Sequence, residues 1–342
     1  MITLLEPGLF TSVQDGGRTG YSHLGVPRAG AADLLSLSHA NLLVGNTPHA
    51  AALEMTLAGP DLRFEADTVM ALAGGSVEAR LDGAPVAMYQ SVAVRAGQIL
   101  RCGTVQTGMR CYLAVAGGIR SAQVLGSAST DTLAGLGPAA LQAGAQLPIQ
   151  AAALQQGFYL RSPPVFTDSV AMRVILGPHQ DHFTPQALQI FLAAAFRVRA
   201  DSDRSGLRLG GPSVARQIDD ELDSQGMLTG AVQVPADGQP IVLLPNHGAT
   251  GGYPVIAAVI SADVPYLGQL RPGTRVRFHT VTRAQALDAL AAEQQKWRVA
   301  LTSADPGLLE ARALMMLAKA HPALRAAQLQ RGPVRVRMRR GP

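Results

Sequence analysis

The polar residues best suited to chemistry lie in glycine-rich loops rather than in periodic segments. The first such loop contains Gln14, Asp15 and Arg18, in the run Gln-Asp-Gly-Gly-Arg. An aspartate three residues before an arginine offers a proton acceptor beside a planar donor for carboxylate or phosphoryl oxygens. The intervening glycines let backbone approach a ligand closely. The pattern indicates either a binding loop or a structural turn held by an Asp15–Arg18 pair.

Glu54 lies in an apolar setting that resembles a strand, within the run ALEMTLAGP. A carboxylate in such a setting is either paired with an arginine or retained for function. Both interpretations remain open for Glu54.

The run GPHQDHF in the second half of the chain contains His179, Asp181 and His182, just before a Thr-Pro pair that is typical of a helix start. Two interpretations of this run stay open: its side chains take part in catalysis, or Asp181 and His182 bond the local backbone in a turn before the helix. Asp203 and Arg204 repeat the pairing of an acid with an arginine in a loop between strands. This loop has two equally supported interpretations, namely a structural Asp–Arg pair within the loop and a substrate-binding site.

The run NHGATGGYP contains Gly251, Gly252 and Tyr253. Its two glycines allow positive φ and a close approach of backbone amides to an anion. We therefore add these three residues to the candidate binding residues.

Several common cofactor motifs are absent from the sequence. It contains no HExxH or CxxC metal motif, no GxxxxGK[ST] loop, no GxGxxG after a strand and no GxSxG. We therefore expect no metal site, no serine hydrolase, and no binding of ATP or NAD by this chain alone. Cys102 and Cys111 lie in apolar segments and are interpreted as structural.

The composition of the 342 residues, 47% of them hydrophobic, favours about two packed domains. A net charge of +5 arises partly from the last residues, RGPVRVRMRRGP, and aromatics are only 4%, so nucleic-acid binding is not expected. No signal-peptide pattern and no apolar run of about 18 residues occurs, so we expect a cytoplasmic protein without a membrane segment.

Short apolar and β-branched runs separated by glycine and proline predict a mainly β protein. We expect β domains at 1–155 and 165–282, followed by a helical appendage and basic tail at 283–342. Two short helices are predicted, one capped by Asp33 and one by Thr184. The first domain is expected to contain strands in the runs DLRFEA, TVMALAGG, VEARLDGAPVAMY, SVAVRAGQILR and RCYLAVAGGI, with Asp82-Gly83 and Ala96-Gly97 as hairpin tips. In the second domain strands are expected at 172–176, 196–199, 228–234, 240–244, 254–260 and 275–281.

Collinear motifs across residues 3 to 279 resemble one family. They include VQDGGRTGYSHLGVPRAGAAD, ALEMTLAGPDLRF, LGPHQDHFT, SDRSGLRLGGP and TGGYPVIAAVISADVPYLGQLRPGTRVRF. The chain is identified as a member of the family of the 5-oxoprolinase C subunit, which includes allophanate hydrolase subunit 2 and biotin-dependent carboxyltransferases. The resemblance implies two cyclophilin-like β-barrel domains with few helices. It also implies a smaller partner subunit of related fold and a third, lactam-utilisation subunit.

The activity implied by this resemblance is ATP-dependent hydrolysis of 5-oxo-L-proline to L-glutamate, carried out by the complex and not by this chain alone. ATP would be bound by the complex. On the matching motifs, Arg18 and Arg204 would hold carboxylate or phosphoryl oxygens, while Asp15 and Asp181 would act on protons or polarise the ring. Gly251, Gly252 and Tyr253 would line the same pocket, with Gln14, Glu54, His179 and Asp203 as further binding residues.

Two motifs differ from the family pattern. His179-Gln180-Asp181 stands where members commonly have Gln-Asp-Asp, and residues 246–250 stand where many have Asp-Arg-Gln-Thr-Thr. No Met-Lys-Met segment that would carry biotin is present. Two alternatives therefore stay open, namely a carboxyltransferase component of a urea-carboxylase or allophanate-hydrolase type of system, and a regulatory protein that antagonises an inhibitor of a histidine kinase.

Overall fold

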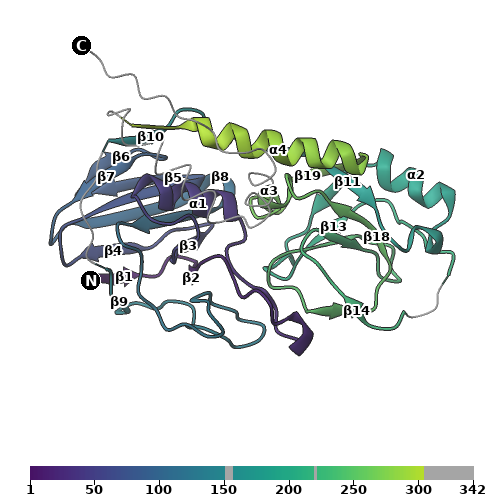
Figure 1. The fold of residues 1–342 in the computed structure, drawn as a ribbon, viewed down its shortest axis with the longest axis horizontal. Coiled ribbons are helices and arrows are strands. Elements are labelled where there is room, and N and C mark those ends of the chain that lie inside the picture. The colour runs from purple at the N-terminus through teal and green to yellow at the C-terminus, as the bar shows by residue number, and fades with distance from the viewer. Residues whose placement is uncertain (151–156, 219–221, 304–342) are drawn as a thin grey trace, which may run out of the picture.

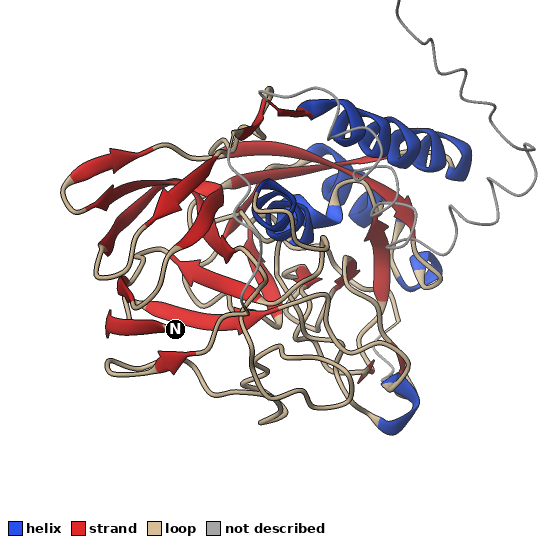
Figure 2. Cartoon of the chain, turned by 60° about the vertical axis from the view of Figure 1, so that its left-hand side comes forward, coloured by secondary structure: helices blue, strands red, loops and turns tan. Residues whose placement is uncertain are grey.

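The computed structural model describes residues 1–150, 157–218 and 222–303. Figure 1 shows two β domains side by side, with one long helix running along both of them. Figure 2 shows that strands and loops make up most of the molecule, and that the longest helix lies at its upper right. The arrangement leaves the two domains in direct contact below this helix.

The N-terminal domain is built on a nine-stranded sheet with the order β2-β3-β8-β4-β1-β9, in which β5 pairs with β6, β7 and β8. Its apolar core gathers residues from most of these strands. The strands are β1 (Ile2–Glu6), β2 (Phe10–Gln14), β3 (Ala52–Thr56), β4 (Asp61–Phe64), β5 (Thr68–Leu81), β6 (Ala84–Val86), β7 (Ser91–Val94), β8 (Ile99–Val115) and β9 (Gln146–Leu147).

The C-terminal domain is a closed barrel with the order β11-β18-β15-β16-β13-β12-β19. The small sheet β14–β17 lies outside the barrel. A second small sheet, β10 (Phe158–Leu160) with β20 (Leu301–Ser303), packs on the N-terminal domain, where the amide of Leu160 donates to the carbonyl of Tyr89. The strands of the C-terminal domain are β11 (Ser169–Leu176), β12 (Phe196–Val198), β13 (Gly206–Gly210), β14 (Gln225–Gly226), β15 (Ala231–Gln233), β16 (Ile241–Leu243), β17 (Thr250–Gly251), β18 (Val255–Val259) and β19 (Arg275–Thr280).

The prediction of a mainly β protein with two barrel-like domains is confirmed, one barrel being closed and the other sheet a half-barrel. The sequence predicted shorter strands in the first domain, with a break at Gly74-Gly75. Instead, β5 continues through this pair, and its pairing with β8 contains register shifts there. A glycine pair in a strand marks a bulge as readily as a turn, which explains the difference.

The two predicted short helices are confirmed. Helix α1 (Leu34–Leu43) begins after Asp33, whose carboxylate accepts from the backbone N–H of Ser36, and α2 (Pro185–Ala193) begins after Thr184. The other helices are η1 (Ser22–Leu24), η2 (Gln180–His182), α3 (Val264–Leu267) and α4 (Arg283–Ala300). Within the described parts of the chain, no helix is both long and apolar enough to cross a membrane.

One of the two expected hairpin tips is confirmed. Asp82 and Gly83 both have positive φ and connect the paired strands β5 and β6. Ala96-Gly97 forms a turn but no hairpin tip, because β7 pairs with β5 and not with the following strand β8.

The expected C-terminal helical segment begins at Arg283 as α4, whereas residues 304–342 lie outside the described residues. The end of α4 packs into the N-terminal domain. Its Trp297 ring lies 4.3 Å from the ring of His39 on α1, and the following strand β20 pairs with β10. The helix therefore joins the two domains along one side.

A second connection joins the domains below α4. The side chain of Gln269, just after α3, donates to Asp33 and to the carbonyl of Arg110, and it accepts from the backbone of Met109 and Arg110. The preceding residue, Gly268, is packed so tightly that an added Cβ would lie 2.3 Å from the carbonyl oxygen of Ala32.

Replacing Gly268 by alanine is therefore expected to destabilise the interface between the domains by about 1–3 kcal/mol. Gly268 has an ordinary helical φ of −63°, so the effect is steric and not conformational. Thermal unfolding of Gly268→Ala would measure it. Gly226→Ala is the matched control, since nothing lies within 4 Å of its added Cβ, and an equal effect of both changes would contradict the steric account.

Candidate functional site

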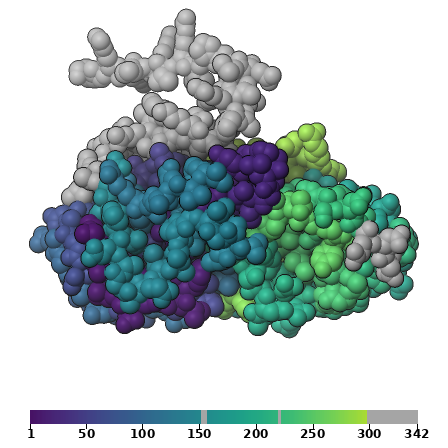
Figure 3. All heavy atoms as spheres, turned by 90° about the horizontal axis from the view of Figure 1, so that it is seen from below, coloured from purple at the N-terminus to yellow at the C-terminus, as the bar shows by residue number. Residues whose placement is uncertain are grey.

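A cavity of about 840 Å³ lies between the two domains. The N-terminal domain contributes residues of the 16–32 loop and of α1, and the C-terminal domain contributes residues within 227–229, 245–249 and 261–265. Helix α4 forms a further wall. Figure 3 shows the purple N-terminal surface directly against the green C-terminal domain.

The loop that carries Arg28 to the cavity is folded back on itself. Gly17 and Gly30 have φ of 82° and 91°, and a Cβ on Gly30 would lie 2.9 Å from the backbone of Gly17. The amide of Arg18 donates to the carbonyl oxygen of Arg28 at 2.6 Å. Only glycine permits so close an approach in this conformation.

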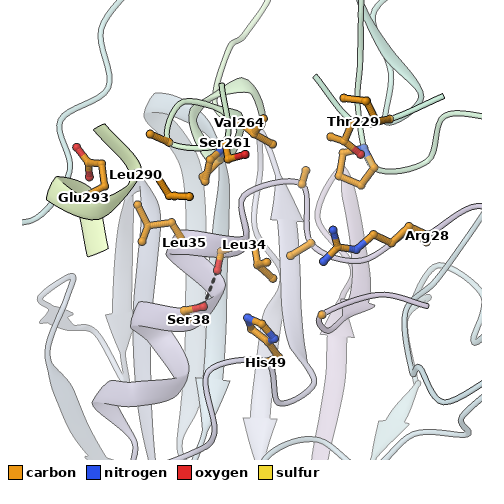
Figure 4. A pocket seen from close by; sticks show the side chains of 18 of the residues that line it. Arg28, Leu34, Leu35, Ser38, His49, Thr229, Ser261, Val264, Leu290 and Glu293 are labelled. Carbon is orange, nitrogen blue, oxygen red and sulfur yellow. Dashed lines mark hydrogen bonds between the residues drawn. The ribbon is translucent and has the colours of Figure 1, made fainter. Parts of the chain in front are cut away.

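Ala29 fixes the same loop to the C-terminal domain. Its amide donates to the carbonyl oxygen of Pro245 at 3.0 Å, and its φ of 51° is unusual for a residue with a Cβ. Such a conformation costs about 1 kcal/mol and persists where the surrounding structure enforces it. The neighbouring Arg28 side chain extends into the cavity, as Figure 4 shows.

His49 and His247 also line the cavity, and His49 points into it from below in Figure 4. His247 is buried, and its Nδ1 lies 2.6 Å from the carbonyl oxygen of Gly248. A carbonyl can only accept, so Nδ1 carries the proton and Nε2 is the acceptor. Burial lowers the pKa of His247, which favours this neutral form.

His39 lines the inner part of the cavity, where α1 meets α4. Its ring packs between Trp297 and Tyr89, and burial lowers its pKa to about 3. Neither ring nitrogen has a hydrogen-bond partner among the described residues. His39 is therefore a neutral, packed side chain at neutral pH.

Asp15 lies beneath the cavity wall and is not one of the lining residues. Its carboxylate accepts from the backbone of Gly17 at 2.8 Å and of Ala128 at 2.7 Å, and from the hydroxyls of Ser127 at 2.6 Å and Ser129 at 2.5 Å. Both carboxylate oxygens are thus engaged. In this structure Asp15 holds the 127–129 segment against the first loop.

Arg18 and Gln14 support the same segment. Arg18 is 2% exposed and donates to the carbonyls of Val124 at 3.2 Å and Ser129 at 2.5 Å, and burial lowers its pKa. The buried Gln14 donates to the carbonyl of Thr130. No direct Asp15–Arg18 hydrogen bond or ion pair occurs in the described structure. The pair that the sequence offered as one interpretation is therefore not formed, and both side chains instead bind the same segment.

Replacing Asp15 by asparagine is expected to lower the free energy of unfolding by about 1–3 kcal/mol, because an amide cannot accept all four hydrogen bonds. Urea unfolding of Asp15→Asn would measure the loss. Asp288→Asn, at an exposed position on α4, is the control and should change stability by less than about 0.5 kcal/mol. A stable Asp15→Asn chain would indicate that the carboxylate is kept for chemistry instead.

Glu54 is fully buried and pairs with two arginines, which is one of the two interpretations that its sequence setting allowed. Arg110 lies on β8 with its Nε 3.4 Å from the carboxylate, whereas Arg204 comes from the other domain. Ala32 N–H and the Tyr112 hydroxyl also donate to the carboxylate, at 2.9 Å and 2.8 Å. We call Glu54, Arg110 and Arg204 the interdomain ion cluster.

Arg204 also connects the interdomain ion cluster to two loops, one that contains Gly30 and one that contains Asn246. It donates to the carbonyl of Gly30 at 2.5 Å and to the side chain of Asn246 at 3.3 Å. An Asp–Arg pair within the loop, one of the two interpretations left open by the sequence, is not what Arg204 forms, because its side chain crosses to Glu54 in the other domain. Asp203 instead accepts from the amides of Ser205 and Gly206, which forms a turn before β13.

His179 and Asp181 lie elsewhere, around η2 beside the end of the barrel. His179 accepts from the amide of Val255 at 3.1 Å and lies 3.2 Å from the side-chain nitrogen of Gln225. Burial, with a further contribution from nearby His182, lowers the pKa of His179. Asp181 is exposed. No group of three or more potential metal ligands is present within the described ranges.

Gly251, Gly252 and Tyr253 follow the cavity residue Ala249 but do not themselves line the cavity. The sequence allowed a positive φ at the two glycines, but neither adopts it. Gly251 belongs to β17, and a Cβ there would lie 2.7 Å from the side chain of Gln233. The glycine at this position allows the side chain of Gln233 to approach closely.

The candidate residues therefore form two groups, not one pocket. Gln14, Asp15, Arg18, Glu54 and Arg204 support the wall between the domains, whereas His179, Asp181 and 251–253 lie toward one end of the barrel. The cavity itself exposes Arg28, His49 and His247, which were not among the candidates. Arg28 and His247 nevertheless occur within the loops that the sequence indicated.

Comparison with known proteins agrees with these features. Residues 24–280 match the family described as the carboxyltransferase domain, subdomains A and B. The chain belongs to this family. The match includes α1, the later part of the first loop and the C-terminal loops at the cavity, whereas α4, which also lines the cavity, lies after the matched residues.

Individual proteins similar to this chain point to the same family. The chain is 39% identical to the C subunit of 5-oxoprolinase from Escherichia coli, covering 86% of this chain and 96% of that protein. It is 35% identical to the C subunit of 5-oxoprolinase from Haemophilus influenzae, covering 84% and 93%. The crystal structure of Kluyveromyces lactis urea amidolyase superposes with a TM-score of 0.80 and 30% identity, covering 86% of this chain but only 19% of that chain.

Proposed function

We propose that this chain is a subunit of an ATP-dependent 5-oxoprolinase, which hydrolyses 5-oxo-L-proline to L-glutamate, and that it is inactive alone. The observation that carries the proposal is the 39% identity to the C subunit of a 5-oxoprolinase over 96% of that protein. The similarity therefore extends over nearly the whole relative. Being one subunit implies partners, which we propose to be a smaller subunit of related fold and a lactam-utilisation subunit.

The residues that line the cavity suit a carboxylate but not a nucleoside triphosphate. Arg28 is the only arginine or lysine among the described lining residues, and a triphosphate usually needs several cations or a phosphate-binding loop. We therefore assign ATP to one of the partners and derive no step through it. Biotin would likewise have to come from another protein, because the sequence carries no biotin segment.

In this proposal Arg28 binds the carboxylate of 5-oxo-L-proline, and His247 removes a proton from the attacking water. The water oxygen bonds to the ring carbonyl carbon, the C–N bond breaks, and the nitrogen takes up the proton. His247 suits this role because its Nε2 is the unprotonated nitrogen. Arg28 suits its role because the fold-back at Gly17 and Gly30 fixes its backbone.

The test is release of glutamate from 5-oxo-L-proline by this chain co-expressed with the two partner subunits. Activity should require ATP and should vanish when this chain is omitted. Each of the other subunits is omitted in turn as a control. An intact complex of all three subunits that releases no glutamate would overturn the proposal.

A second candidate is a carboxyltransferase that moves a carboxyl group from carboxybiotin to urea or to another amide. The similarity to urea amidolyase favours it, although this chain corresponds to only 19% of that protein's length. Urea-dependent loss of the carboxyl group from carboxybiotin, measured on the same complex, would support this candidate over the first.

A further inference from the structure

The cavity between the domains is cationic on one side and mostly apolar on the other. Figure 4 shows Arg28 and His49 on one side, with Leu35 of α1 and Leu290 of α4 on the other, where Ser38 and Glu293 are also drawn. Trp297 and Leu42 continue the apolar side where α1 meets α4. A ligand that matches both sides has a polar end and an apolar end.

The cationic end is open to an anionic partner. Arg28 is exposed, and its guanidinium makes no hydrogen bond or ion pair with any residue that the structure describes. Among the lining residues that the structure describes, the only acidic one is Glu293, which lies on α4 and accepts from the indole N–H of Trp297 at 2.9 Å. No carboxylate of the cavity therefore neutralises Arg28, and the guanidinium suits a carboxylate bound in bidentate fashion.

The apolar end is larger than a small lactam needs. A volume of about 840 Å³ falls within the roughly 300–1,000 Å³ typical of sites for ligands of drug size. 5-Oxo-L-proline is a single five-membered ring with one carboxylate. Bound to Arg28, it would leave the space between α1 and α4 unfilled.

We propose that this cavity binds a carboxylate that bears an apolar group, with the carboxylate on Arg28 and the apolar group against Leu35, Leu290 and Trp297. This inference rests on the proposed function for the reaction, and it extends the substrate class to lactam or amide acids with an apolar substituent. Helix α4 supplies much of the apolar side, although it lies after the residues that match the family.

The test measures binding of straight-chain carboxylates to the full chain by calorimetry, from acetate through butyrate and hexanoate to octanoate. Each methylene buried should tighten binding about fourfold. 1-Octanol, which lacks the carboxylate, should bind at least about tenfold more weakly than octanoate. These measurements need neither the other subunits nor ATP, so they can succeed or fail independently of glutamate release.

Two variants distinguish the two ends of the cavity. Arg28→Gln should remove the preference for octanoate over octanol, whereas Leu290→Gln should weaken octanoate but leave acetate unchanged. Arg120→Gln is the matched control, because Arg120 is exposed and lies outside the cavity. Affinity that does not change with chain length, or a preference for octanoate that persists in Arg28→Gln, would overturn the proposal.

Discussion

Replacing Glu54 by glutamine is expected to lower the free energy of unfolding by about 3–5 kcal/mol. The change keeps the shape of the side chain but leaves Arg110 and Arg204 without their buried counter-charge. Arg110 is 2% exposed and Arg204 is 9% exposed, so water cannot replace the lost carboxylate. Desolvation already lowers the pKa of Arg110, and the Glu54 carboxylate opposes this effect.

Urea unfolding of Glu54→Gln would measure the loss. Glu78→Gln is the matched control, because Glu78 pairs with Arg80 at the surface, where both side chains are more than half exposed. That pair should contribute less than about 1 kcal/mol. If Glu54→Gln costs no more than Glu78→Gln, the interdomain ion cluster does not stabilise the fold.

The same variant should also affect how the two domains sit against each other. Glu54 and Arg110 belong to the N-terminal sheet, and Arg204 precedes β13 of the barrel. Arg204 also binds the carbonyl of Gly30, which lies two residues after Arg28. The cluster therefore holds the loop that presents Arg28, so loss of Glu54 is expected to alter the cavity as well as the stability.

Local patterns in the sequence predicted the local structure well. The Asp33 and Thr184 caps and the Asp82-Gly83 hairpin depend on residues close together in the chain, and all three are confirmed. Strand β13 was not predicted, because its residues GLRLG begin and end with glycine. The long strand β5 was divided at its glycine pair for a similar reason. In both cases pairing with distant strands overrode the local preference.

The candidate site was predicted less well, because its geometry depends on contacts between distant residues. Arg18 and Arg28 lie in the same loop, yet Arg18 is buried and Arg28 lines the cavity. Two contacts determine that Arg28 and not Arg18 faces the cavity. Gly30 packs on Gly17, and the amide of Ala29 binds the carbonyl of Pro245 in the other domain. Arg204 likewise pairs with a residue 150 positions away. Neither arrangement follows from spacing along the chain.

Replacing His247 by glutamine is expected to lower kcat for 5-oxo-L-proline hydrolysis by about 100-fold or more, with little change in KM. Under the proposed function His247 is the base that accepts a proton from water, and glutamine cannot do so. The hydrogen bond of Nδ1 to the carbonyl of Gly248 leaves Nε2 as the unprotonated nitrogen. Glutamate release by the assembled complex would measure the effect, with His279→Gln, at an exposed position on β19, as the matched control.

The pH dependence provides a second readout for His247. Burial lowers the pKa of its imidazole below the ordinary value of 6.5, so the neutral base persists as the pH falls to that value. Activity of the unmodified complex should therefore be kept at pH 6.5 and fall only as the pH drops through the lowered pKa. In His247→Gln this acidic decline should disappear from the residual activity, since the group that titrates is gone. A variant that keeps both its rate and its acidic decline would show that a different group accepts the proton.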